Sequence, residues 1–207
     1  MCFSAQASFV AGTGLAIVGL LSIQKNKVKK LQPLAVIPLL FGIQQLCEGV
    51  VWVTQNNPSL AYQNELARYA YLFFAYVIWP FWIPFTVYMI APNGVKKRRL
   101  ASLVGAGTVV ASTLLWALVK VGATSAITCN HIEYALNMQR PLEPFGLVWY
   151  CIATITPFFV IGKNKFNKLG AFLLISVLVS YFFYYVHLTS VWCFFVAIFS
   201  ALIYRML

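Results

Sequence analysis

The stretch PLAVIPLLFGIQQLCEGVVWVT, from Pro33 to Thr54, contains no lysine or arginine and has a single acidic residue, Glu48. A predominantly apolar run of about 20 residues is what an α-helix needs to cross roughly 30 Å of hydrocarbon. We therefore predict that this stretch is a transmembrane helix.

Six further segments of similar character lie on either side of it along the chain. They are Ala7–Ile23, Leu66–Ala91, Leu100–Val121, Phe145–Gly162, Leu169–His187 and Ser190–Met206. The whole chain of 207 residues is 61% hydrophobic and 9% charged, with a mean hydropathy of +0.81, whereas soluble domains carry roughly 25% charged residues. We predict an all-α integral membrane bundle of seven transmembrane helices. Residues 1–207 should form one domain, because no polar stretch is long enough to fold separately.

The net charge of +11 is concentrated in a few places. Three short loops and the C-terminus hold twelve of the fifteen basic residues: Lys25, Lys27, Lys29, Lys30, Lys96, Lys97, Arg98, Arg99, Lys163, Lys165, Lys168 and Arg205. Cytoplasmic loops are enriched in lysine and arginine, so we place the N-terminus outside and the C-terminus in the cytoplasm. This distribution indicates a lipid bilayer, including its anionic headgroups, as the partner rather than nucleic acid.

Two of the basic loops resemble each other. The sequence IQKNKVKKL at 23–31 matches IGKNKFNKL at 161–169, which aligns the first two predicted spans with the fifth and sixth. A parallel repeat of three helices, one connecting helix and three more helices would produce this pattern. Enrichment of cytoplasmic loops in lysine would also produce it.

A polar stripe runs along the helix predicted at Pro33–Thr54. Gln44 lies four residues before Glu48, Gln45 lies three before it, and Trp52 lies seven after Gln45, so the four residues share one helix face. A charged side chain at the centre of a membrane helix costs about 2.5–3.5 kcal/mol on insertion scales. We therefore expect Glu48 to face the bundle interior, either as a proton or cation site or as a neutral carboxyl group that links helices.

A second set of polar residues lies at the predicted turn between the last two spans. Tyr184 and His187 share a face at the end of one span, and Cys193 lies six residues after His187 in the next. With Gln44, Gln45, Glu48 and Trp52, we predict that Tyr184 and His187 form a pocket open to the outer side. A histidine at a helix end is also commonly an interfacial side chain.

The long outer loop contains Cys129, His131 and Glu133 at alternating positions, which an extended strand would present on one side. The chain has five cysteines, and the other four are Cys2, Cys47, Cys151 and Cys193. They could form disulfides, pack as small apolar side chains or bind a metal. Sulfur, imidazole and carboxylate ligands suit Zn or Cu, and Cys2, His187, Cys193 and Glu48 are the first candidate ligands. The spacing matches no established zinc motif.

Three parts of the chain resemble a family of bacterial membrane proteins of unknown function. These are MCFSAQASF at 1–9, which has the form MCFSAxASF, the Pro38–Trp52 segment with Gln44, Gln45, Glu48 and Gly49, and SVWCFF at 190–195. The resemblance spans nearly the whole chain. It implies that Cys2 and the Glu48 segment are features of the family, and it assigns no catalytic residue.

From these features we predict a multi-pass protein of the bacterial inner membrane that binds, transports or senses a small molecule or metal ion. Glu48 would bind the proton or cation, and kinks at Pro80 and Pro157 would allow gating. The alternative is a metal- or thiol-dependent enzyme acting on a lipid or quinone-like substrate, with His187, Cys193 and Cys2 as ligands or nucleophile and Glu48 as general base. A structural subunit of a larger membrane complex is a third class.

Overall fold

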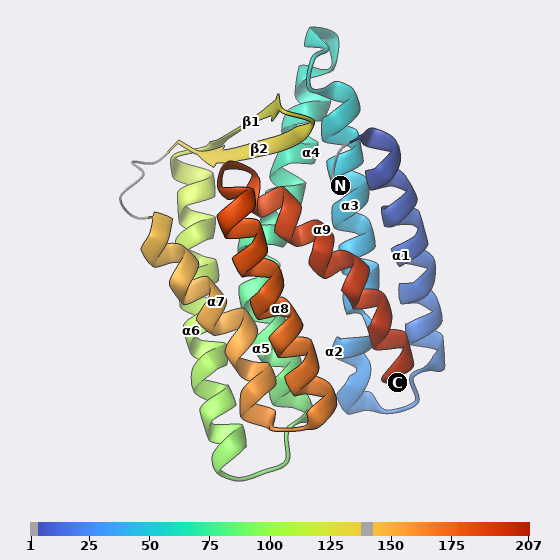
Figure 1. Ribbon diagram of the computed structural model, residues 1–207, viewed down its shortest axis with the longest axis vertical. Coiled ribbons are helices and arrows are strands. Elements are labelled where there is room, and N and C mark those ends of the chain that lie inside the picture. Colours follow the sequence, from blue (N-terminus) through green and yellow to red (C-terminus); the bar gives the residue numbers. More distant parts are fainter. Residues whose placement is uncertain (1–3, 138–142) are drawn as a thin grey trace.

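The computed structural model describes residues 4–137 and 143–207, which form a helical bundle closed at one end by a β-hairpin (Figure 1). Cys2 lies outside the described residues. The α-helices are α1 (Ala5–Lys25), α2 (Gln32–Ala35), α3 (Ile37–Thr54), α4 (Ala61–Phe73), α5 (Trp79–Ile90), α6 (Val95–Lys120), α7 (Glu143–Ile161), α8 (Asn164–Phe183) and α9 (Leu188–Ser200). Short 3₁₀ segments are η1 (Lys29–Leu31), η2 (Pro58–Leu60), η5 (Tyr185–His187) and η6 (Ala201–Arg205).

In the described part of the chain, six helical segments are long and apolar enough to cross a membrane. They are Ala5–Lys25, Lys29–Thr54, Pro58–Ile90, Val95–Lys120, Asn164–Phe183 and Tyr185–Arg205, and the shorter apolar segment Gly146–Ile161 adds a seventh helix. The predicted all-α membrane bundle is therefore confirmed. The third segment begins before the predicted Leu66, because exposed residues such as Tyr62 and Glu65 extend α4 beyond the rest of the bundle.

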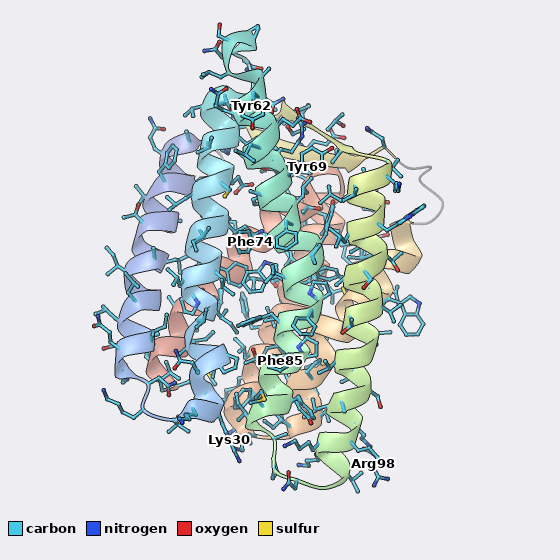
Figure 2. The ribbon with its side chains drawn as sticks, turned by 180° about the vertical axis from the view of Figure 1, so that it is seen from behind. Lys30, Tyr62, Tyr69, Phe74, Phe85 and Arg98 are labelled. Atoms are coloured by element: carbon cyan, nitrogen blue, oxygen red, sulfur yellow. The ribbon has the colours of Figure 1, made fainter. Side chains whose placement is uncertain are left out.

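The basic loops gather at one end of the bundle. Figure 2 shows Lys30 and Arg98 at the end opposite Tyr62 and Tyr69. Lys25 Nζ donates a hydrogen bond to the carbonyl oxygen of Tyr204 (2.9 Å), and Lys96 Nζ donates one to that of Ile161 (3.2 Å). These lysines neutralise the partial negative charge at the C-terminal ends of two helical segments.

Glycines allow α1 and α3 to pack with their backbones in close contact. A Cβ at Gly42 would lie 2.6 Å from the backbone nitrogen of Ala16, and a Cβ at Gly19 would overlap the backbone of Leu39. Small residues at a helix interface permit such an approach in membranes. α3 is thereby held against α1 along its length, which leaves its other faces for α4 and α9.

The segment between α4 and α5, η3 (Phe74–Ile78), is a π-helix in which the Trp79 N–H donates to the Phe74 carbonyl five residues earlier. The same pattern would require an N–H at residue 80 for the Ala75 carbonyl, but Pro80 has none. Instead, the Tyr150 hydroxyl of α7 donates to that carbonyl oxygen at 2.6 Å. The predicted irregularity at Pro80 therefore takes the form of a π segment that is stabilised by a neighbouring helix.

Pro84 lies inside α5 and cannot donate to the carbonyl of Pro80 one turn earlier. Gly107 of α6 packs against this part of α5, and a Cβ at residue 107 would overlap the Pro80 carbonyl oxygen. The absence of a side chain at Gly107 is thus required for α5 and α6 to pack.

Replacing Gly107 with alanine should destabilise the protein, because the added methyl group must displace the Pro80 carbonyl. Overpacking of this kind costs about 1–3 kcal/mol. The matched control is Gly105→Ala on the same helix, where a Cβ meets nothing within 4 Å and higher helix propensity should be neutral or slightly stabilising. Thermal unfolding of both variants in detergent measures the difference. Equal Tm values for the two would contradict this account of α5–α6 packing.

Candidate functional site

A buried polar layer crosses the bundle at the middle of α3. Gln44, Gln45 and Glu48 each have 0% exposed surface. The Ser190 hydroxyl, in the first turn of α9, donates to Glu48 Oε1 at 2.6 Å. Trp79, the first residue of α5, donates from Nε1 to Gln44 Oε1 at 2.7 Å. The predicted polar stripe therefore faces the bundle interior and links α3 to two other helices.

Gln45 differs from its neighbours in this layer. Neither its amide nitrogen nor its amide oxygen has a hydrogen-bond partner among the described residues, although both atoms are buried. Leaving such a group without a partner costs about 1–3 kcal/mol. A buried, unsatisfied amide one turn from a buried carboxyl group is the kind of local feature that a polar ligand or water would satisfy.

Tyr71 of α4 connects this layer to the hairpin. Its hydroxyl donates to the Thr189 carbonyl (3.2 Å), next to Ser190, and its ring stacks on Tyr134 of the hairpin with centroids 4.6 Å apart. The Cys193 thiol lies against the side chains of Tyr71 and Gln44 and close to Glu48. Cys193 therefore belongs to the polar layer.

The hairpin consists of β1 (Ala123–Thr128) and β2 (His131–Leu136), paired antiparallel with Thr128 opposite His131. Cys129 and Asn130 form the connecting turn, with φ values of 48° and 58°, as in a type I′ turn. The expected strand thus includes His131 and Glu133, but Cys129 lies in the turn, so the three residues do not alternate along one strand.

The two histidines of the chain meet where the hairpin contacts η5. Their ring centroids are 4.9 Å apart, and His187 Nε2 lies 2.7 Å from the Thr128 hydroxyl. The Tyr184 ring packs 5.2 Å from that of His131, whose Nδ1 contacts the Cys129 carbonyl at 2.7 Å. Tyr184 and His187, which we expected beside Glu48, therefore make these contacts with the hairpin.

A polar network attaches the hairpin to the ends of α3 and α4. Gln55 donates from Nε2 to the Ser125 carbonyl (2.6 Å) and accepts from the Ser125 hydroxyl (2.7 Å). Asn64 donates to the Thr54 hydroxyl (3.0 Å) and to Gln55 Oε1 (3.2 Å). Ile132 and Tyr134 are buried underneath. The hairpin is thus a packed cover over this end of the bundle (Figure 1).

The remaining predicted residues lie apart. Trp52 is half-buried on α3, and its indole N–H is buried without a hydrogen-bond partner among residues 4–137 and 143–207. Cys47, Cys129, Cys151 and Cys193 form no disulfide in the described part of the chain. No group of three or more His, Cys, Asp or Glu side chains in that part could hold a metal ion. Of the first candidate metal ligands, Cys2 lies outside the described residues, Glu48 and Cys193 lie in the polar layer, and His187 lies apart from them beside His131.

A small cavity lies beside the polar layer. Its volume is about 30 Å³, and its walls come from α3, α5, α7, α8 and α9. The lining residues are Phe41, Trp79, Ile83, Tyr150, Thr154, Leu173, Trp192, Cys193 and Val196. Of the residues predicted from sequence, Cys193 lines this cavity, and Gln44 is joined to it through Trp79.

The sequence was also compared with known proteins. The model of the family DUF6629, described as a family of unknown function, matches residues 1–207. The chain belongs to DUF6629. The resemblance stated above is thus confirmed as membership of a family of unknown function. No curated protein and no solved structure matches the chain.

The partners of the polar stripe in this DUF6629 chain are not evident from its sequence. Ser190 is a single hydroxyl at a predicted helix start, and Trp79 is one of several aromatic residues in its span. A signal was nevertheless present, because a buried carboxyl group requires a donor from another helix. Ser190 lies between His187 and Cys193, which are both candidate ligands.

Replacing Ser190 with alanine should destabilise the protein by about 1–3 kcal/mol, because it removes a donor from buried Glu48. The control is Ser102→Ala on α6, where an exposed hydroxyl makes only a local 3.4 Å contact with the Arg98 carbonyl. Thermal unfolding in detergent should show a lower Tm for the first variant alone. A Tm for Ser190→Ala equal to that of wild type would mean that this contact does not stabilise the layer.

Proposed function

We propose that this protein binds a small cation in the buried polar layer around Glu48 and carries it across the membrane. The observation that carries the proposal is the complete burial of Glu48 together with Gln44 and Gln45 inside a bundle of apolar helices. Intramembrane ionisable residues are costly and typically mark ion or substrate pathways. Purely structural linkage of helices does not require an amide such as Gln45 to remain unsatisfied.

The composition of the layer favours a small ion of low charge. Glu48 is the only acidic residue in the seven predicted spans, and the described part of the layer also contains the amides of Gln44 and Gln45 and the hydroxyl of Ser190. Divalent Ca²⁺ requires about six to eight oxygen ligands, and Mg²⁺ retains several waters. A monovalent cation can be neutralised by a single carboxylate. If the bound cation is a transition metal, Zn or Cu would be bound by Glu48 and Cys193.

Two features of the structure could allow the conformational change that transport of the cation requires. The π segment Phe74–Ile78 ends next to Trp79, which donates to Gln44, and the prolines Pro80, Pro84 and Pro157 interrupt regular helix bonding in α5 and α7. Such irregularities often occur at functional sites. The hairpin covers the opposite end from the basic loops. With these loops in the cytoplasm of a bacterial inner membrane, the hairpin would control access from outside.

A thiol-dependent enzyme is the second candidate, because Cys193 lines the cavity while its thiol lies close to Glu48. Glu48 would act there as a general base toward a lipid or quinone-like substrate. Loss of chemistry in Cys193→Ala, with cation binding intact, would favour the enzyme over the transporter.

The test compares purified wild-type protein with Glu48→Gln, which preserves side-chain shape and an oxygen acceptor for Ser190. Na⁺, K⁺, NH₄⁺ and Zn²⁺ are titrated separately while Tm is recorded. A bound ion at one hundred times its Kd stabilises by about 2.7 kcal/mol, so wild type should show a higher Tm with at least one ion, and Glu48→Gln should not. Uptake of that ion into proteoliposomes should be lost in the same variant.

Glu65→Gln is the control, because Glu65 is exposed on α4 and its substitution makes the same change in charge. This variant should retain both the Tm shift and uptake. Undiminished uptake by Glu48→Gln would remove Glu48 from the mechanism.

A further inference from the structure

The cavity beside the polar layer has walls built largely from aromatic rings. Phe41 and Trp79 stack with centroids 3.7 Å apart, and Tyr150 meets Trp192 edge to face at 5.6 Å. All four residues line the cavity. Because the rings come from different helices, the fold brings them together around one small space.

The polar atoms of these walls are engaged elsewhere. Trp79 donates to Gln44, and Trp192 donates from Nε1 to the Ser176 hydroxyl at 3.1 Å. The Tyr150 hydroxyl is committed to the Ala75 carbonyl, and the Thr154 hydroxyl donates to the Tyr150 carbonyl at 2.8 Å. The aromatic walls therefore offer carbon and ring surface instead of hydrogen-bond donors. Ring faces carry partial negative charge and attract cations.

One side of the cavity borders the polar layer. Cys193 lines the cavity, and its side chain is close enough to Glu48 for an electrostatic interaction. Trp79 also lines it and donates to Gln44, which lies one helical turn from Glu48. The cavity thus combines aromatic residues in its walls with a carboxyl group beyond the wall that Cys193 forms.

We infer that the cation carried by this protein is ammonium or a primary alkylammonium of the size of methylammonium. The inference rests on the proposed cation site at Glu48 and names the class of its ligand. The polar layer around Glu48 would stabilise the positively charged nitrogen. In methylammonium the methyl group would face Trp79 and Trp192, and in ammonium an N–H group would do so.

Size is compatible with this ligand. A water molecule requires about 10–15 Å³ of such space, so a cavity of about 30 Å³ has room for two heavy atoms of similar size. Methylammonium has two heavy atoms. An alkali ion gains nothing from a methyl-sized space and would interact with the rings only after losing its water.

The experiment measures apparent Kd from Tm shifts of the full-length protein with methylammonium, tetramethylammonium, K⁺ and methanol. Methylammonium is expected to bind most tightly, and Glu48→Gln is expected to abolish the Tm shift that methylammonium causes. Trp192→Phe replaces the indole with a smaller ring that attracts cations less strongly, and it should weaken methylammonium binding by part of the about 2- to 30-fold that a whole cation–π contact contributes. Trp116→Phe, at an exposed tryptophan on α6, should change nothing.

Val196→Leu provides a second variant, because it fills part of the cavity without changing an aromatic ring or a charge. It should weaken methylammonium binding while leaving K⁺ binding unchanged. This variant keeps the test decisive if Trp192→Phe fails to fold.

The remaining outcomes overturn the inference in distinguishable ways. Glu48-dependent binding of K⁺ at least as tight as that of methylammonium, unaffected by Trp192→Phe and Val196→Leu, would leave the proposed function standing and refute the ligand class. Equal stabilisation by methanol would show an apolar or neutral guest instead of a cation. Absence of any Glu48-dependent cation effect would refute both proposals.

Discussion

The interior of a membrane contains no water to satisfy polar groups, so each one must find its partner inside the protein. Glu48 imposes the strongest form of this requirement, because it is fully buried in α3. Ser190 supplies its donor from α9, while Gln44 one turn away receives the Trp79 indole from α5. Three helices are thereby fixed around one carboxyl group. Their relative rotation is set by hydrogen bonds, which are directional, as well as by apolar packing, which is not.

The same requirement applies to the backbone of the α4–α5 segment. The π segment and the two prolines leave carbonyl groups that α5 itself cannot satisfy. Tyr150 satisfies one of them with its hydroxyl, and Gly107 lets α6 approach another. Tyr150 is also a wall of the cavity. A change in the π segment would therefore move a residue that lines the cavity, which couples backbone irregularity to the shape of the binding space.

The sequence predicted the helical segments well because their length and hydropathy report directly on the thickness of the bilayer. It also predicted that Glu48 and its stripe would face inward, since a carboxyl group in lipid is costly. It did not predict that His187 would pack against His131, because that contact depends on how the hairpin folds back over η5. The π segment was equally inaccessible, since Pro80 indicates an interruption of the helix but not which residue of α7 compensates for it. The cavity is formed by aromatic rings from residues far apart in the sequence, and no local sequence pattern predicts that these rings come together.

The cavity and the polar layer are best understood together. A hydrated alkali ion entering the layer must replace its water with protein oxygens, and the described residues of the layer supply one carboxyl group, two amides and a hydroxyl. An ammonium ion needs fewer ligands, because its N–H groups form directional hydrogen bonds and any alkyl group can contact the rings without desolvation cost. Cys193 lies between the two regions and belongs to both. A ligand with one cationic and one apolar end matches this arrangement better than a spherical ion does, because the lining of the cavity is mostly apolar and the carboxyl group lies on its Cys193 side.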